Sequence, residues 1–312
     1  MRGRVSLRRP RANDVPLMGR STHVDLGRVG VWCGGFRLHA DAGAVGDAAA
    51  ELEELGYQAL FVPGGDTTVV LDASRRVLDA TRAVPVATGI LNVWTHSPGE
   101  VALMCAQLER DHPGRFQLGL GIGHAPAIAR LGLTYRRPVA TMAEWLDGLD
   151  AADPPVPVGR RLLAALGPRM LELARDRTAG AHPYKVPVEH TRIARRALGD
   201  GPLLAPEQAV LLETDPARAR ELSRAHIARY LTLDNYTANL LRCGFDERDL
   251  RDGGSDRLVD ALVAWGDEEQ IAARVAAHLD AGADHVCIQV ADVGWEDLPL
   301  EQWRRLAPAL LN

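Results

Sequence analysis

Two histidines and one aspartate are placed where a proton could be transferred. Asp66 follows the strand-like run 58–62, His96 follows 84–90 and His124 follows 116–122. Imidazole exchanges a proton near neutral pH, and a carboxylate can act as a base. Because the carboxyl ends of parallel strands meet at one edge of a sheet, these three side chains are the candidates for acid–base catalysis.

The chain lacks the sequence motifs of common metal sites and of a serine nucleophile. The chain contains no HExxH motif, no GxSxG motif and no calcium-binding loop. The sequence therefore gives no support to metal-centred hydrolysis or to a serine nucleophile.

Glycines alternate with large apolar residues from Gly119 to Gly123. The dinucleotide fingerprint GxGxxG needs a glycine where this chain has His124, so we reject that motif. Alternate residues of a strand share one face, and missing side chains on that face leave space for a flat ring. Glycines also follow other predicted strands and favour a large ligand over ordinary tight turns: Gly34, Gly35, Gly64, Gly65 and Gly167.

Two neighbouring turns carry hydrogen-bond donors suited to an anion. The first, Gly167-Pro168-Arg169, leads from a strand into a helix, whose free N–H groups can bind an anion with help from the Arg169 charge. The second, Gly180 to His182, follows the next strand along the chain. The two turns together predict a phosphate site, and an ordinary capped helix is the structural alternative.

Short strand-like runs alternate with amphipathic helices from Val29 onward, which is typical of βαβ units. The strand candidates are residues 29–33, 58–62, 84–90, 116–122, 161–166, 178–181, 208–213 and 285–290. A helical insert, about 217–281, separates the last two. The pattern predicts an α/β fold, a (β/α)8 TIM barrel whose active site lies at the carboxyl ends of its strands. A doubly wound sheet is the rival architecture.

Residues 28–312 are expected to form a single barrel domain, since such barrels commonly run past about 250 residues. Residues 1–27 are rich in arginine and have no apolar run, so they predict a flexible N-terminal extension, with Met18 as an alternative start.

Charge and composition limit the classes of molecule that this protein is expected to bind. A net charge of −5 argues against nucleic acid, and no apolar run approaches the roughly 20 residues needed to span a bilayer. Four scattered cysteines without a CxxC pair predict reduced thiols and a cytoplasmic protein. Small molecules are therefore the expected ligands. Lys185 is the only lysine, which we attribute to the arginine-rich composition of the chain.

Several stretches occur together in a characteristic order. They are Thr88-Gly-Ile-Leu-Asn92, Pro98 at a helix start, Gly114 to Gly123, Ala165 to Met170, and Gly180 to His182. In this combination, over about residues 28–292, the chain resembles the luciferase-like monooxygenase class of flavin and deazaflavin oxidoreductases, especially the branch that uses coenzyme F-420.

The resemblance implies a homodimeric barrel that binds a tricyclic ring across the strand ends. It implies a cis peptide bond at Gly89–Ile90 behind the ring, and a cofactor phosphate near the two donor-rich turns. The cofactor contacts that it implies are Gly89, Ile90, Asn92, Gly123, His124, Ala165, Gly167, Pro168, Arg169, Gly180, Ala181 and His182.

The chain departs from these relatives at two acidic positions. After strand two, where they carry an acidic residue often followed by histidine, this chain has Pro63-Gly64-Gly65-Asp66, and His124 replaces an acid after strand four. Three alternatives stay open: Asp66 substitutes, His124 or His96 acts instead, or the reaction needs little acid–base help.

The leading hypothesis is a coenzyme F-420-dependent oxidoreductase that transfers a hydride to or from a small alcohol, activated alkene or imine. The first alternative is an FMN-dependent monooxygenase on the same barrel. The second is a barrel that binds a cofactor or metabolite without catalysis, which the Gly64-Gly65 departure favours.

Overall fold

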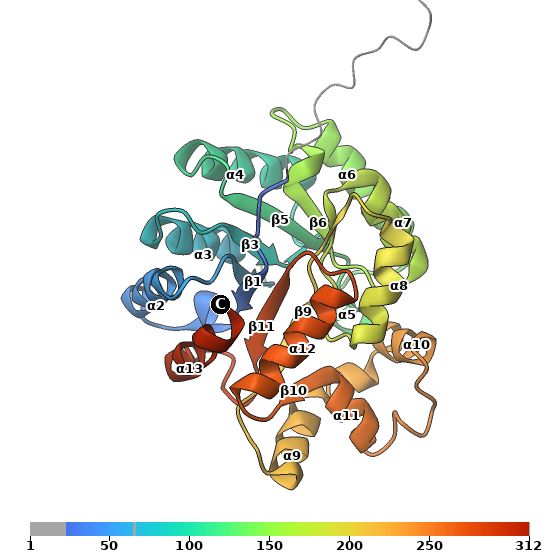
Figure 1. The fold of residues 1–312 in the computed structure, drawn as a ribbon. Coiled ribbons are helices and arrows are strands. Elements are labelled where there is room, and N and C mark those ends of the chain that lie inside the picture. Colours follow the sequence, from blue (N-terminus) through green and yellow to red (C-terminus); the bar gives the residue numbers. More distant parts are fainter. Residues whose placement is uncertain (1–22, 65–66, 312) are drawn as a thin grey trace, which may run out of the picture.

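The structure is a computed structural model that describes residues 23–64 and 67–311. Its strands form one parallel sheet at the centre of the molecule, and the helices surround that sheet (Figure 1). The strands are β1 (Val29–Trp32), β2 (Leu60–Pro63), β3 (Val86–Gly89), β4 (Leu91–Asn92), β5 (Phe116–Gly121), β6 (Arg161–Leu163), β7 (Gly180–Ala181), β8 (Leu203–Leu204), β9 (Glu207–Leu211), β10 (Val263–Trp265) and β11 (Val286–Val290).

The sheet curls back on itself. Its strand order is β10-β9-β11-β1-β2-β3-β5-β6-β7-β8, with β4 paired to β5, and only Ala205 and Pro206 separate β8 from β9. The backbone N–H of Asp284 donates to Leu204 O and that of Cys287 donates to Pro206 O, so the segment leading into β11 also contacts the β8–β9 connection. This curled parallel sheet with outer helices is TIM-barrel-like, which places the carboxyl ends of its strands on one side.

The helices follow the strands and cover the outer face of the sheet. They are α1 (Gly35–Leu38), α2 (Ala42–Leu55), α3 (Thr67–Ala80), α4 (Pro98–Asp111), α5 (Ala125–Arg130), α6 (Pro138–Asp150), α7 (Pro168–Arg177), α8 (Val188–Leu198), α9 (Pro216–Ile227), α10 (Asp234–Arg242), α11 (Asp256–Leu262), α12 (Glu268–Asp280) and α13 (Leu300–Leu310), with 3-10 turns η1 (Val158–Arg160) and η2 (Tyr230–Thr232). Asp215 caps α9, and Asp267 with Gln270 forms a capping box on α12, as their spacing predicts.

Each of the eight predicted strand regions contains a strand, but the structure adds three short ones. β4 follows the predicted run 84–90, and β8 precedes the predicted run 208–213. β10 corrects the description of residues 217–281 as a helical insert, because Val263, Ala264 and Trp265 pair in parallel with β9 between α11 and α12. A three-residue strand between two helical patterns is too short for its period to stand out.

The N-terminal segment also differs from its prediction. Val24 and Leu26 lie in the expected flexible region, yet both are buried against Phe61 and Ala87 inside the curled sheet. Their apolar side chains fill one end of that interior, and His285 Nδ1 lies 3.0 Å from the carbonyl of Gly27. Residues 1–22, including Met18, lie outside the described residues.

Two apolar layers hold the fold together, one between sheet and helices and one inside the sheet. Along β5, Leu118 and Leu120 pack in the outer layer with the helices. The intervening Gly119 and Gly121 therefore face the interior, because side chains alternate along a strand. In the described part of the chain, no helix combines the length and apolarity that a membrane span requires.

Candidate functional site

The carboxyl ends of four neighbouring strands are partly open to solvent. We call this surface the strand-end floor, and it consists of Gly64, Gly89, Ile90, Ile122, Gly123, Ala164 and Gly167, all half-buried. Of its glycines, only Gly167 has open space beside it, since a Cβ there would meet nothing closer than 3.8 Å. A Cβ on Gly64 would lie 2.2 Å from Ile90 O and one on Gly89 would lie 2.7 Å from Trp32 Nε1, so the chain itself fills the space beside those two. The floor follows the strand ends from β2 through β3 and β5 to β6, at the edge where this fold carries its active sites.

A bulge in the sheet shapes the middle of the floor. Between Ala87 and Leu91 the chain advances four residues, whereas their partners on β5, Gln117 and Leu120, are three residues apart. The Gly89–Ile90 peptide bond in this bulge is cis, as the family resemblance implies. The bulge is held on one side by Trp32, whose indole Nε1 donates to Gly89 O at 2.8 Å.

The glycines of β5 make room for this bulge, which corrects the sequence interpretation that they leave space for a ring. A Cβ on Gly119 would lie 1.9 Å from Thr88 O, and one on Gly121 would lie 2.2 Å from Ile90 Cδ1. The Thr88 hydroxyl donates to Gly119 O at 2.7 Å and accepts from Gly119 N at 2.8 Å. The chain's own bulge fills the space, and a ligand would lie above it.

The floor ends at the N-terminus of α7. Gly167 precedes this helix with no side-chain cap, and Pro168 and Arg169 are exposed. A Cβ on Gly167 would meet only Arg242 Nη2, at 3.8 Å. The free helix end and the Arg242 guanidinium make this end of the floor attractive to an anion, and Arg169 in the first turn of α7 adds a positive charge to the same region.

The second donor-rich turn does not reach the surface, and its phosphate contacts stay a prediction. Gly180, Ala181 and His182 are buried, as is Ala165. The backbone N–H of Gly180 donates to Thr178 Oγ1, and that of His182 donates to Leu163 O. The His182 ring stacks on Phe61 inside the sheet, 4.8 Å between ring centres, because this strand end turns its side chain inward.

His124 lies at the open end of β5 and precedes α5. Burial lowers the pKa of His124; a hydrogen bond with Asn235 opposes this shift, and the nearby Arg229 charge adds to it. In the described part of the chain Nδ1 is buried without a partner, and the ring lies 5.6 Å from that of Tyr236 on α10. The side chain is therefore a neutral imidazole near physiological pH, able to take up a proton.

The other two predicted catalytic residues are placed differently. His96 lies outside the floor; its Nδ1 is 3.7 Å from Glu100 Oε2 on α4, and its carbonyl accepts from Trp145 Nε1 of α6. Asp66 lies outside the described residues. Asn92 is half-buried, and its amide lies beside Gly123, 3.4 Å from the position of a Cβ there. The acid–base role of each of these residues stays a prediction.

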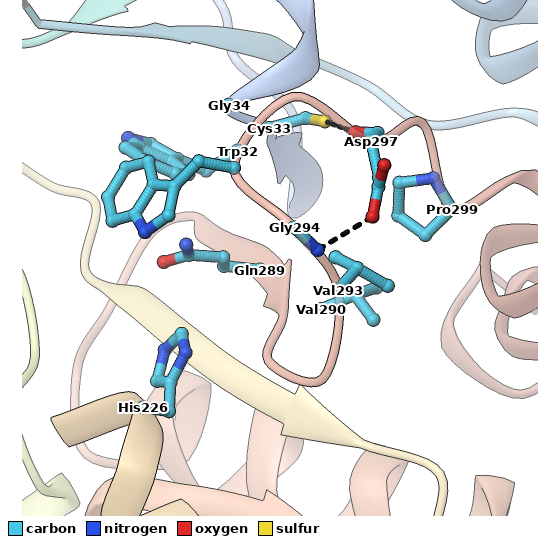
Figure 2. A pocket seen from close by; sticks show the side chains of 11 residues that line it. Trp32, Cys33, Gly34, His226, Gln289, Val290, Val293, Gly294, Asp297 and Pro299 are labelled. Carbon is cyan, nitrogen blue, oxygen red and sulfur yellow. Dashed lines mark hydrogen bonds between the residues drawn. The ribbon is translucent and has the colours of Figure 1, made fainter. Parts of the chain in front are cut away.

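Sequence reasoning missed a polar cluster beside the floor. Lys185, Glu207 and Gln289 are buried, and His226 is half-buried next to them. Gln289 and His226 line a cavity of about 30 Å³ together with Trp32 and the loop 290–299 (Figure 2). A signal was available for Gln289, which is the polar residue of an otherwise apolar run, Val286 to Val290, and a buried polar residue needs partners.

The described residues contain no group of three or more histidine, cysteine or acidic side chains arranged to hold a metal ion. All four cysteines are free thiols, and burial raises the pKa of Cys33 and Cys105 to about 12.

Comparison with known proteins identifies the class. Residues 23–153 match the family model described as luciferase-like monooxygenase. A curated relative, the 5,10-methylenetetrahydromethanopterin reductase of Methanolobus tindarius, is 23% identical over 257 residues, which cover 66% of this chain and 77% of the relative.

Two solved structures share the fold at low identity. An F-420-dependent secondary alcohol dehydrogenase, in complex with an F-420–acetone adduct, has a TM-score of 0.69 at 14% identity over 92% of this chain and 99% of its own. The oxygenating constituent of 3,6-diketocamphane monooxygenase from Pseudomonas putida, a type II Baeyer–Villiger monooxygenase in complex with FMN, has a TM-score of 0.63 at 15% identity over 90% and 96%.

Residues 23–153 therefore match a luciferase-like monooxygenase domain, the chain has a TIM-barrel-like fold, and the resemblance inferred from the sequence is confirmed. Its relatives include enzymes named for F-420 and a monooxygenase in complex with FMN.

Proposed function

We propose that this protein is a coenzyme F-420-dependent oxidoreductase that transfers a hydride to or from a small organic substrate. The observation that carries the proposal is the strand-end floor, which runs to an uncapped helix end beside Arg169 and near Arg242. Such a surface suits a ligand with a flat head and an anionic tail, and the class already associates this fold with such cofactors.

The residues present fit this cofactor at both ends. A Cβ on Gly167 would fill the cradle at the start of α7, and Arg242 approaches that point without occupying it. At the other end, Ile90 and Ile122 offer a half-buried apolar surface for a ring. The cofactor would therefore be held by the bulge at its ring and by Gly167, Arg169 and Arg242 at its phosphate.

The protein's own contribution would be orientation and proton transfer. When bound, F-420 supplies a deazaflavin that exchanges hydride and favours two-electron steps. Trp32 fixes the bulge through its bond to Gly89 O, so the floor stays rigid. His124, at the end of β5, would hold or release the proton that accompanies hydride transfer, because its imidazole is neutral and its Nδ1 has no protein partner among the described residues.

Separate titrations of the purified chain with F-420 and with FMN test the cofactor. We expect tighter binding of F-420, and we expect Arg169→Ala to weaken it about tenfold or more, since a charge-assisted contact contributes about 1.5–3 kcal/mol. Arg76→Ala on the outer helix α3, where the arginine is also exposed, is the matched control and should bind as the native chain does. Failure to bind either compound would refute the proposal.

His124→Ala is expected to lower kcat about a hundredfold or more with little change in coenzyme affinity, because a positioned acid or base contributes roughly 10²–10⁴-fold. The measurement is steady-state turnover as a function of pH, in which the variant should lose one ionisation. His96→Ala is the competing assignment. If that variant is slow and His124→Ala is not, the proton-transfer role belongs to His96.

Two other functions, an FMN-dependent monooxygenase and a non-catalytic carrier, would give different results in these binding and turnover experiments. The family model's description and the FMN complex of the camphane monooxygenase favour an FMN monooxygenase as the second candidate. Preference for FMN together with substrate-dependent oxygen consumption would support it. A non-catalytic carrier would instead bind reduced F-420 tightly, and no member of a panel of carbonyl compounds, alkenes and imines would oxidise the coenzyme.

A further inference from the structure

Lys185, the single lysine of this chain, is buried among residues from three other elements. Its Nζ lies 2.8 Å from Glu207 Oε1 on β9, 2.8 Å from Gln289 Oε1 on β11 and 2.6 Å from His226 Nε2 on α9. A buried ammonium is costly unless it is paired and hydrogen-bonded. Here Glu207, itself buried, balances the charge, and the ammonium has three acceptors.

The ammonium fixes the orientation of the Gln289 amide. Because an ammonium only donates, the Gln289 atom facing it must be the oxygen. The same Oε1 accepts from the Tyr184 hydroxyl at 2.8 Å, so two donors hold it. The Nε2 group is therefore turned away from Lys185, toward Trp32 (Figure 2), and no acceptor within the described part of the chain bonds to it.

The ammonium also fixes the His226 ring. His226 Nε2 faces a group that only donates, so this nitrogen accepts and the proton of the neutral ring is on Nδ1. Burial and the Lys185 charge hold the pKa of His226 well below its ordinary value, against a bond with the backbone of Ala291. The ring therefore adds no charge to the cavity that it lines.

That cavity is small, polar and without net positive charge. Its volume of about 30 Å³ gives room for roughly two water-sized groups, so one functional group of a ligand fits and a ring does not. Gln289 Nε2 provides a donor, while Asp297 belongs to the opposite wall and the Lys185 charge is balanced by Glu207. This charge pattern favours a neutral oxygen acceptor over a carboxylate.

We propose that the cavity between Trp32, His226 and Gln289 binds a neutral carbonyl group, and that Lys185 is the positioning residue that makes its wall a hydrogen-bond donor. The binding of a carbonyl group does not depend on the proposed function. The further statement that this carbonyl belongs to the substrate does rest on it. Without the Lys185 ammonium, the Gln289 amide could also flip, so that its oxygen rather than its nitrogen faced the cavity. The cavity wall would then be a donor in some molecules and an acceptor in others, and it would select less strongly for a carbonyl group.

Acetamide and acetate, which match in shape and differ in charge, test the site without any cofactor. In protein labelled with ¹⁵N-tryptophan and ¹³C-lysine, the Trp32 indole signal, identified by its loss in Trp32→Phe, lies at the cavity wall. The single lysine gives a single ε-methylene signal. We expect both signals to shift saturably with acetamide and not with acetate, and Gln289→Met to abolish the shifts.

The role of Lys185 is tested by removing its charge together with that of its partner. Lys185→Met/Glu207→Gln should raise the acetamide dissociation constant about fivefold, read from the Trp32 signal, since one oriented hydrogen bond contributes about 1 kcal/mol. In the native chain, nuclear Overhauser effects from the Gln289 amide protons should reach Trp32 rather than the Lys185 ε-methylene. This measurement decides the orientation even if the double variant does not fold.

Three results would overturn the inference. Absence of a saturable acetamide shift would mean that the cavity holds only solvent. Equal shifts with acetate would refute a neutral ligand, and an unchanged dissociation constant in a folded double variant would remove the role of Lys185. Because no coenzyme is present, a chain that binds acetamide but not F-420 would keep this site and lose only the proposed cofactor.

Discussion

Lowering the pH from about 6.5 to about 4 is expected to reduce the free energy of unfolding by several kcal/mol. Burial, as the largest cause in each case, lowers the pKa of His182, His190 and His285 to about 4 and that of His278 to about 3, against an ordinary value of 6.5. Each pKa unit corresponds to 1.36 kcal/mol, so even one of these histidines contributes about 3 kcal/mol.

The sign follows from which state binds the protons. Between pH 6.5 and 4 the unfolded chain protonates these histidines and the folded chain does not, so acid favours unfolding. The full stability is present above pH 6.5. Urea unfolding measured at intervals from pH 7.5 to 4.5 should show this loss before most carboxylates titrate, and a constant free energy over that range would contradict it.

One histidine can be removed with little change in packing. His285 stacks on Phe61 inside the sheet, with 5.6 Å between ring centres, and Phe can retain that stack. We expect His285→Phe to reduce the slope of unfolding free energy against pH by about 1.4 kcal/mol per pH unit within this window, the contribution of one proton. The slope is the readout, so a change in overall stability from losing the bond to Gly27 does not affect the test.

The parts of the fold that follow from local pattern could be predicted from the sequence. Apolar runs indicate all eight strand regions, and Gln270 three residues after Asp267 is typical of the capping box that begins α12. Val24 and Leu26 show the limit of such reasoning. Two apolar residues in a polar, arginine-rich segment carry no periodic signal, and only the open end of the sheet interior makes their burial favourable.

The local structure of the candidate site was predictable where one turn forms it and unpredictable where distant strands form it. Gly167-Pro168-Arg169 leads from a strand into α7, as its composition indicates, and its binding of an anion stays a prediction. The Lys185 cluster joins residues up to 104 positions apart, and the pairing of β9 with β11 brings them together. The arginine-rich composition of the chain explains why it has a single lysine. The polar residue in the β11 run indicates a need for partners, but the sequence does not show that Lys185 is one of them.

The glycines of β5 also show what residue composition cannot predict, and substituting them is expected to change stability strongly. Alternation of glycine with Leu118 and Leu120 correctly indicated a face without side chains, but composition does not say whether a ligand or the chain itself fills that face. In the structure the chain fills it, because a Cβ on Gly119 would lie 1.9 Å from the backbone oxygen of Thr88. A backbone atom in a paired sheet cannot move aside cheaply.

Gly119→Ala is therefore expected to lower the free energy of unfolding by about 3 kcal/mol or more, the upper range for an overpacked core. Gly121→Ala should cost less, since its Cβ would meet the flexible end of Ile90, and Ile90→Ala should relieve that contact. Gly99→Ala is the control. It lies in α4 with no atom within 4 Å of the added Cβ, and should stabilise the chain by up to about 1 kcal/mol.

The same series separates packing from ligand binding. If Gly119 serves the bulge, Gly119→Ala displaces Thr88 and with it the Gly89–Ile90 segment of the strand-end floor, so stability and coenzyme affinity fall together. If the glycine instead served the ligand, affinity would fall while the urea midpoint stayed at the native value. Equal midpoints for Gly119→Ala and Gly99→Ala would show that the bulge tolerates a side chain on β5, contrary to the close packing between Thr88 and Gly119.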